Sequence, residues 1–387
     1  MSKLAINGGT PVFTGSFPSW PYWNDEEKEN LLRALEAGQW GTLGAEALTF
    51  AKEFSDYIGT KYAVCVNTGT QALEMMLRGC GIGYGDDVIT TPYTFSATVS
   101  SIAWCGAMPV MADVDPDTSN IDPDSLEDSL TSRTKAILLV HVAGRPCDMD
   151  AVCDFAKKKG ILVLEDSAHA HGSEWKGRKC GSLGDASAFS FQGSKAITGG
   201  EGGCVTTDNE KIYDKVWEYH NSGRAKDGST VMGTNARMAE WEASVLRAQL
   251  KRLQDQCLLR QKNAAYVSSR IEGLPGVTLP RKDSRITLWN GYMYAFRAKN
   301  RDRFVEALNA EGIPCSKGYP SLEDMGMLRE AYFEKHTGRK FRGAARKDGI
   351  SLLVKEAVWI PAPILMGGEE ETEKIAEAIT KVAKEIN

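Results

Sequence analysis

The sequence lacks the features that mark membrane, secreted or nucleic-acid-binding proteins. Its longest apolar run, residues 136–144 (AILLVHVAG), is far too short to cross a bilayer. The first residues contain no apolar segment followed by a cleavage site, so no signal peptide is predicted. Acidic residues (51) outnumber basic ones (46), which leaves no basic excess for nucleic acid or an anionic membrane. These absences predict a cytoplasmic protein without a nucleic-acid or membrane partner.

Sequence signals for a disulfide framework, a zinc site or a nucleotide site are also missing. The nine cysteines are scattered, and the closest pair, Cys147 and Cys153, lacks zinc-ligand spacing. An Asp-x-x-His-x-His string at residues 166–171 is a conceivable metal site. Because it follows a strand and is not helical, we rank metal binding below cofactor contact and predict no metal. Neither a P-loop nor a correctly spaced dinucleotide fingerprint occurs.

Residues 60–210 alternate between short apolar β-rich runs and helical stretches. This alternation predicts an α/β fold with a large, doubly wound, mostly parallel sheet. Residues 239–271 favour one long or broken helix that leaves this domain, and a smaller α+β domain follows. We therefore predict a large domain over residues 1–255, including an N-terminal arm, and a small C-terminal domain over residues 256–387.

Three of the predicted strands end in residues that suit a ligand site. Ligands of α/β sheets bind beyond the carboxyl ends of the strands. Thr68-Gly69-Thr70 follows one strand and opens a helix, which makes either an anion site or an ordinary helix cap. Asp166 ends a second strand. Lys195 follows a third and precedes residues 199–203, which hold four glycines in five positions.

The three strand ends together match the needs of pyridoxal phosphate. Its phosphate needs a helix N-terminus, its pyridine nitrogen needs a carboxylate, and its aldehyde needs a lysine amine. Each signal alone has a common structural explanation, because threonines often cap helices and most lysines are solvated surface residues. The ordered set of all three predicts a pyridoxal-phosphate enzyme.

With these residues in view, most of the chain resembles the DegT/StrS family of sugar aminotransferases. The motifs that carry the resemblance include NTGTQAL (67–73), PYTFSAT (92–98), EDSAHAHGS (165–173), SFQGSK (190–195), GGEGG (199–203) and GTNARMAEWEASVLRAQL (233–250). The same stretches are similar to 3-amino-5-hydroxybenzoate synthase and to scyllo-inosose aminotransferases. The resemblance implies fold type I of the pyridoxal-phosphate-dependent transferases, which is aspartate-aminotransferase-like, and a homodimer with active sites shared between subunits.

The resemblance also implies a role for each matching residue. Lys195 matches the Schiff-base lysine, and Asp166 matches the carboxylate partner of the pyridine nitrogen. The remaining matches are cofactor contacts: Gly69, Thr70 and Ser190 to the phosphate, Phe95 and Ala168 on the two ring faces, His169 to the 3-hydroxyl, and Asn235 to the phosphate of the neighbouring subunit.

The implied reaction is transamination from glutamate or glutamine to the ketone of a keto sugar or keto cyclitol. The alternative is elimination and aromatisation of an amino carbocycle, as in 3-amino-5-hydroxybenzoate synthase. Many relatives carry a histidine downstream of the position of Tyr319-Pro320, and this chain has none there or in residues 359–367. The acceptor is therefore not carried over. A dehydratase is disfavoured because such relatives have histidine at the position of Lys195, and a catalytically dead sensor is disfavoured because Lys195 and Asp166 are both present.

Overall fold

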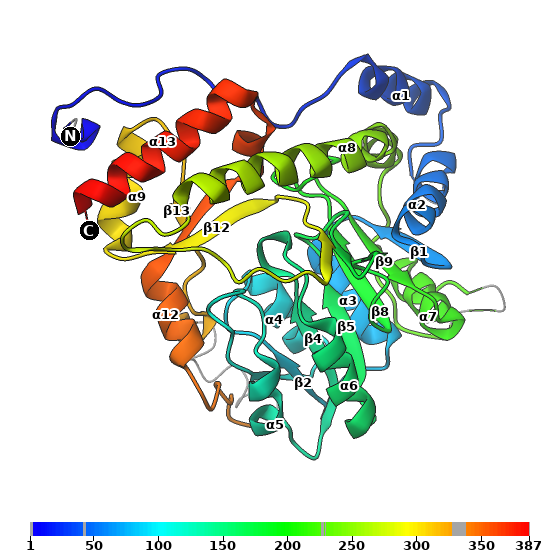
Figure 1. The fold of residues 1–387 in the computed structure, drawn as a ribbon. Coiled ribbons are helices and arrows are strands. Elements are labelled where there is room, and N and C mark those ends of the chain that lie inside the picture. The colour runs from blue at the N-terminus through cyan, green and yellow to red at the C-terminus, as the bar shows by residue number, and fades with distance from the viewer. Residues whose placement is uncertain (1–2, 42–43, 226–227, 229, 327–337, 387) are drawn as a thin grey trace.

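A seven-stranded sheet, in the order β1-β9-β8-β5-β4-β2-β3, organises the larger part of the computed structural model (Figure 1). The structure describes residues 3–41, 44–225, 228, 230–326 and 338–386. Only β9 runs antiparallel to its neighbours in this sheet. The strands are β1 (Tyr62–Val66), β2 (Asp87–Thr90), β3 (Met108–Met111), β4 (Thr134–Val140), β5 (Leu162–Asp166), β8 (Ala186–Ser190) and β9 (Gly203–Thr207).

Helices cover both faces of this sheet, because successive strand side chains point to opposite faces and both sets are apolar. Val64 and Val66 of β1 pack into the core that includes α3 and α7, whereas Cys65 between them packs into the core of α2 and α8. The helices of this part are α1 (Asp25–Glu36), α2 (Ala45–Ile58), α3 (Gly69–Gly79), α4 (Ser96–Trp104), α5 (Leu126–Ser129), α6 (Met149–Lys159) and α7 (Glu210–His220). The predicted doubly wound, mostly parallel sheet of fold type I is confirmed.

The helix α8 (Glu240–Ile271) joins the two parts of the structure as one unbroken helix. Its first half, through Cys257, packs in the core of the large sheet, and Ala264 to Ile271 pack in a second core. Figure 1 shows it crossing the top of the molecule from the sheet toward α13. The predicted boundary at residue 255 therefore falls inside a continuous helix, and it stays a prediction.

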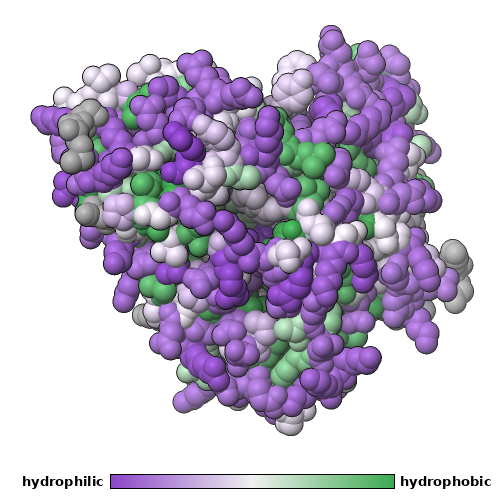
Figure 2. All heavy atoms as spheres, viewed as in Figure 1, coloured by the Kyte–Doolittle hydropathy of each residue, from purple (hydrophilic) through white to green (hydrophobic). Residues whose placement is uncertain are grey.

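The C-terminal part contains a four-stranded antiparallel sheet, β10-β12-β14-β13. Its elements are β10 (Val277–Thr278), β12 (Met293–Ala298), β13 (Ser316–Lys317), β14 (Ala357–Pro361), α9 (Arg301–Ala310), α12 (Asp348–Glu356) and α13 (Glu369–Ile386). A three-stranded sheet pairs β6 (Glu174–Trp175) and β7 (Arg178–Lys179), which lie between β5 and β8 in the chain, with β11 (Ile286–Leu288), which lies between β10 and β12. Figure 2 shows that hydrophilic side chains cover most of the face seen in Figure 1, with apolar patches among them.

The N-terminal arm packs against the C-terminal part, although the predicted division places it in the large domain. Leu4 is buried in the core formed by α9, α13 and the four-stranded antiparallel sheet. The backbone amides of Ala5 and Val12 donate to the carboxylate of Glu311, at 2.8 Å and 3.0 Å. From there the chain runs back over the top of the molecule to α1 (Figure 1). Among the described helices, none has the length and apolar character needed to cross a bilayer.

Candidate active site

The start of α3 and the end of β8 form one corner of the site. The hydroxyl of Thr68 caps α3 by accepting a hydrogen bond from the amide of Gln71 at 3.1 Å. The amides of Gly69 and Thr70, in the first turn, have no carbonyl partner within the helix and can bind an anion. A Cβ atom at Gly69 would lie 2.4 Å from the Cβ of Ser190, so only glycine permits this close approach. The predicted phosphate contacts Gly69, Thr70 and Ser190 are therefore brought together.

Asp166 presents a buried carboxylate at the end of β5, with only 4% of its surface exposed. It accepts hydrogen bonds from the hydroxyl of Thr98 at 2.8 Å and from the amide of Ala168 at 3.1 Å. Burial raises the pKa of Asp166 despite these bonds and the nearby positive charge of Lys195. A carboxylate that is destabilised in this way is suited to a cationic N–H donor such as a protonated pyridine nitrogen.

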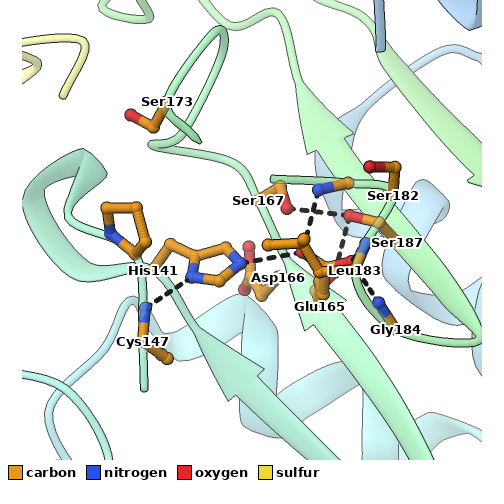
Figure 3. A network of polar contacts seen from close by, with 12 residues as sticks. His141, Cys147, Glu165, Asp166, Ser167, Ser173, Ser182, Leu183, Gly184 and Ser187 are labelled. Carbon is orange, nitrogen blue, oxygen red and sulfur yellow. Dashed lines mark hydrogen bonds and ion pairs between the residues drawn. The ribbon is translucent and has the colours of Figure 1, made fainter. Parts of the chain in front are cut away.

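A second buried carboxylate, Glu165, anchors the strand end from the opposite side (Figure 3). One oxygen accepts the amides of Leu183 at 2.8 Å and Gly184 at 2.7 Å. The other accepts the amide of Gly181 at 2.8 Å and lies 2.9 Å from Nε2 of His141. Burial opposes the charge on Glu165, but its hydrogen bond to His141 and these amides hold its pKa below the ordinary value. The network fixes the backbone on which Asp166 is carried.

The same network contains the one group of potential metal ligands found among the described residues: His141, Glu165 and Cys180. Nδ1 of His141 already accepts the amide of Cys147 at 3.0 Å, so its Nε2 carries the proton and donates to Glu165. The donor atoms of His141 and Glu165 are therefore committed to hydrogen bonds, and burial raises the pKa of the Cys180 thiol, so the group is explained as structural. Asp166, His169 and His171, the string considered from the sequence, do not form such a group within the described residues.

Lys195 lies in the loop after β8 and extends its amine toward an aromatic cluster. Its Nζ lies 3.5 Å from the hydroxyl of Tyr292 and 5.2 Å from the centre of that ring. The ring of His169 packs on the other side of the cluster, 4.4 Å from Tyr292 between ring centres. Nε2 of His169 lies 3.4 Å from the hydroxyl of Tyr319, and its Nδ1 is buried without a partner among the described residues.

The buried ring of His169 is uncharged at neutral pH. Burial, and after it the positive charge of Lys195, hold the pKa of His169 well below its ordinary value. An uncharged imidazole has one donor and one acceptor nitrogen, so the unpartnered Nδ1 leaves His169 able to bind one more polar group. This orphaned atom fits the predicted contact with a cofactor hydroxyl.

The structure places the other predicted contacts at the same end of the sheet with different exposures. Phe95 precedes α4 and is 59% exposed, whereas Ala168, two residues after Asp166, is half-buried. Asn235 is exposed, and its segment lies beside β1 of its own chain, where the amide of Asn67 donates to the carbonyl of Ala236 at 2.9 Å. The side-chain oxygen of Asn235 accepts the amide of Arg237 at 3.4 Å.

Sequence reasoning missed three contacts of the site: Thr98, Tyr292 and Tyr319. Thr98 lies within the PYTFSAT motif, at the start of a helix, which is a signal that could have drawn attention to it. Tyr292 and Tyr319 come from the C-terminal part and reach the strand ends only through tertiary packing. No local pattern in the sequence distinguishes them from ordinary core tyrosines.

Comparisons with known proteins agree on one family. The family model described as the DegT/DnrJ/EryC1/StrS aminotransferase family matches residues 21–380. The chain is 35% identical to 3-amino-5-hydroxybenzoate synthase of Amycolatopsis mediterranei, covering 94% of this chain and 96% of that protein. It is 33% identical to L-glutamine:2-deoxy-scyllo-inosose aminotransferase of Streptoalloteichus tenebrarius, covering 98% and 97%. The crystal structure of 3-amino-5-hydroxybenzoic acid synthase superposes with a TM-score of 0.88 at 32% identity, covering 97% of this chain and all of that one.

Proposed function

The chain belongs to the DegT/DnrJ/EryC1/StrS aminotransferase family, and we propose that it uses pyridoxal phosphate to transfer an amino group from glutamate or glutamine to the ketone of a keto sugar or keto cyclitol. One observation supports this proposal more strongly than any other. Lys195, the buried Asp166 carboxylate and the free amides at the start of α3 all lie at the carboxyl end of the same sheet.

The residues present fit pyridoxal phosphate. The amides of Gly69 and Thr70 and the hydroxyl of Ser190 would bind the phosphate, and Asp166 would accept the N–H of the ring. The other predicted contacts are Phe95 and Ala168 on the ring faces and His169 at the 3-hydroxyl, where its unpartnered Nδ1 suits the role. When bound, the cofactor supplies an aldehyde that holds amines covalently and a ring that withdraws electrons from the attached carbon.

The role of the chain's own residues would then be to move one proton. Nζ of Lys195 would hold the cofactor at rest and, once displaced, would take the proton from the substrate carbon that bears nitrogen. The same atom would return this proton on the cofactor side, so that this one transfer would need no second acid or base. Asp166 would keep the ring protonated, because loss of that proton would leave the buried carboxylate without its charged donor.

The proposed homodimer with shared sites is supported by an exposed apolar surface beside the Lys195 loop. A groove of about 540 Å³ runs between α1 and residues 198–200, and Trp23, Leu31 and Leu32 line it. Trp23 is 65% exposed and Leu32 is 49% exposed, which is costly on a monomer and typical of an interface. A partner that covers this groove would lie next to the glycine-rich loop after Lys195, and Asn235 would complete the neighbour's phosphate site.

The experiment that tests the transfer uses a panel of ketones. The enzyme is first converted to its amino form with glutamine or glutamate, and then mixed with keto sugars, nucleotide-linked keto sugars and keto cyclitols. Return of the yellow absorbance with one class identifies the acceptor. If no ketone restores the absorbance while an amino carbocycle is converted to an aromatic product, the alternative holds. That alternative, a synthase of the 3-amino-5-hydroxybenzoate type, is favoured by the 35% identity to such an enzyme.

A further inference from the structure

A chain of polar groups leads from Lys195 through Tyr292 into the loop after β8. Nζ of Lys195 lies 3.5 Å from the hydroxyl oxygen of Tyr292, which in turn lies 3.4 Å from the hydroxyl oxygen of Ser194. Ser194 is hydrogen-bonded to the side-chain oxygen of Gln192 at 2.8 Å. Two of these distances are long, but contacts of this kind commonly shorten when substrate binds.

The donor in each of these hydrogen bonds follows from the number of protons that each group carries. The side-chain oxygen of Gln192 also accepts the amide of Ser194 at 2.9 Å, which fixes it as an acceptor. The single hydroxyl proton of Ser194 is therefore directed to Gln192, and Ser194 can only accept from Tyr292. The phenol proton of Tyr292 is used in this contact, so that its oxygen lone pairs face Lys195. A lysine amine or ammonium can donate to that oxygen.

The ring of Tyr292 is held rigidly enough to serve as a fixed acceptor. Only 3% of the residue is exposed, and the ring packs against His169. Its amide donates to the side-chain oxygen of Asn290 at 3.0 Å, and its carbonyl accepts the amide of Ala362 at 3.0 Å. Nζ of Lys195 lies 5.2 Å from the ring centre, where a positive charge is attracted to an aromatic ring.

We propose that Tyr292 is a further catalytic residue, whose phenol oxygen holds the released amine of Lys195 and stabilises the ammonium that this amine becomes when it takes the substrate proton. The inference rests on the proposed function. A carbon–hydrogen bond of the substrate would break and leave its electron pair to the electron-withdrawing group that the cofactor supplies, while a nitrogen–hydrogen bond would form on Lys195; Lys195 would later give up the same proton and return to the uncharged amine. Tyr292 keeps its own proton throughout. Ser194 and Gln192 are positioning residues that orient the phenol.

The test compares Tyr292→Phe, which keeps the ring and removes the hydroxyl, with Tyr294→Phe as a matched control. Tyr294 is equally buried, and its hydroxyl contacts Ser268 at 2.8 Å. The first measurement uses cofactor-free protein: pyridoxal phosphate is added, borohydride traps it at timed intervals, and mass spectrometry follows the label on Lys195. We expect labelling at a pH where the lysine amine is mostly protonated to be about ten- to hundred-fold faster in Tyr292→Phe, because labelling needs the uncharged amine and the variant lacks the oxygen that stabilises the ammonium. Tyr294→Phe should match the wild type.

The second measurement isolates the proton transfer. Single turnovers are run with L-glutamine and L-glutamate, each with hydrogen or deuterium on the α-carbon. In Tyr292→Phe the rate should fall by about ten- to hundred-fold and the isotope effect should rise, because proton transfer becomes slower than the other steps. A merely structural loss of packing would slow turnover without raising the isotope effect, and that result would contradict the proposal.

The positioning role of Ser194 is tested in the same assays. Ser194→Ala should slow proton transfer less than Tyr292→Phe does, and adding it to Tyr292→Phe should change nothing further. Additive effects, or wild-type labelling and isotope effects in Tyr292→Phe, would overturn the proposal. Failure of the proposed function is distinguishable, because the wild type itself would then either show no label on Lys195 or carry the label without transferring an amino group from glutamine or glutamate. Ser194 is exposed, so its variant keeps the proposal testable even if Tyr292→Phe folds poorly.

Discussion

Replacing Asp166 with asparagine should weaken the binding of the cofactor without lowering the stability of the cofactor-free protein. The asparagine oxygen can still accept the amide of Ala168, and its NH₂ group can donate to Thr98. Thr98 can in turn donate to Thr94, which lies 2.8 Å away between hydroxyl oxygens. The substitution therefore keeps the shape and satisfies the hydrogen bonds, but it removes a buried negative charge.

The sign of the stability effect follows from the pKa of Asp166. Because burial raises this pKa, the folded cofactor-free protein holds a proton on Asp166 at higher pH than the unfolded chain does. The free energy of unfolding therefore loses a contribution as pH rises from the ordinary carboxyl pKa through the raised one. Asp166→Asn should remove this loss, so that the cofactor-free variant is at least as stable as the wild type at pH 7.

The effect on the cofactor should be opposite. A hydrogen bond to a charged group contributes about 1.5–3 kcal/mol, so pyridoxal phosphate should bind roughly 10- to 150-fold more weakly to Asp166→Asn. Transamination should fall further, by orders of magnitude, because the ring would no longer be held protonated. Thermal unfolding with and without cofactor, a binding titration and turnover measure these quantities.

Asp113 provides the matched control for this variant. It is a buried carboxylate on the far edge of the sheet, and it accepts the amides of Gly349 and Ile350 at 3.0 Å and 2.9 Å. Asp113→Asn replaces one of these acceptor oxygens with an NH₂ group that faces a backbone amide donor. It should therefore destabilise the protein and leave cofactor affinity unchanged. The reasoning is refuted if Asp166→Asn binds cofactor as the wild type does, or if it destabilises the cofactor-free protein as Asp113→Asn does.

Three further predictions follow from the site. Gly69→Ala should weaken cofactor binding at least tenfold, because its Cβ would collide with Ser190, whereas Gly41→Ala meets nothing within 4 Å and should bind normally in the same titration; equal binding by both variants would be inconsistent with the phosphate site. His169→Ala should shift the pH midpoint of the bound cofactor's absorbance, and His220→Ala, far along α7, should not; an unchanged curve for His169→Ala would favour a packing role. Mixing the inactive variants Lys195→Ala and Asn235→Ala after dissociation should restore activity, since a shared site leaves one intact site in each mixed dimer; no recovery, or full activity of Asn235→Ala alone, would rule out the shared site.

The site residues that the sequence predicts are those that directly follow a strand. Asp166 and Lys195 lie at the end of apolar runs or within a few residues of it. Because the carboxyl ends of parallel strands meet at one edge of the sheet, the sequence already predicts that both residues lie at that edge. Tyr292 meets Lys195 across 97 positions, and Thr98 meets Asp166 across 68, so neither contact leaves a local pattern. The strands of two or three residues, such as β6, β7 and β13, are too short to show periodicity. The exposed groove beside α1 also depends on packing that composition does not reveal.

The covalent position of the cofactor tests the central claim most directly. Protein loaded with pyridoxal phosphate is reduced with borohydride and digested, and the labelled peptide is identified by mass spectrometry. We expect yellow protein with the label on Lys195, and no label in Lys195→Ala. A label on any other lysine, or unlabelled protein that nevertheless aminates a ketone, would contradict it.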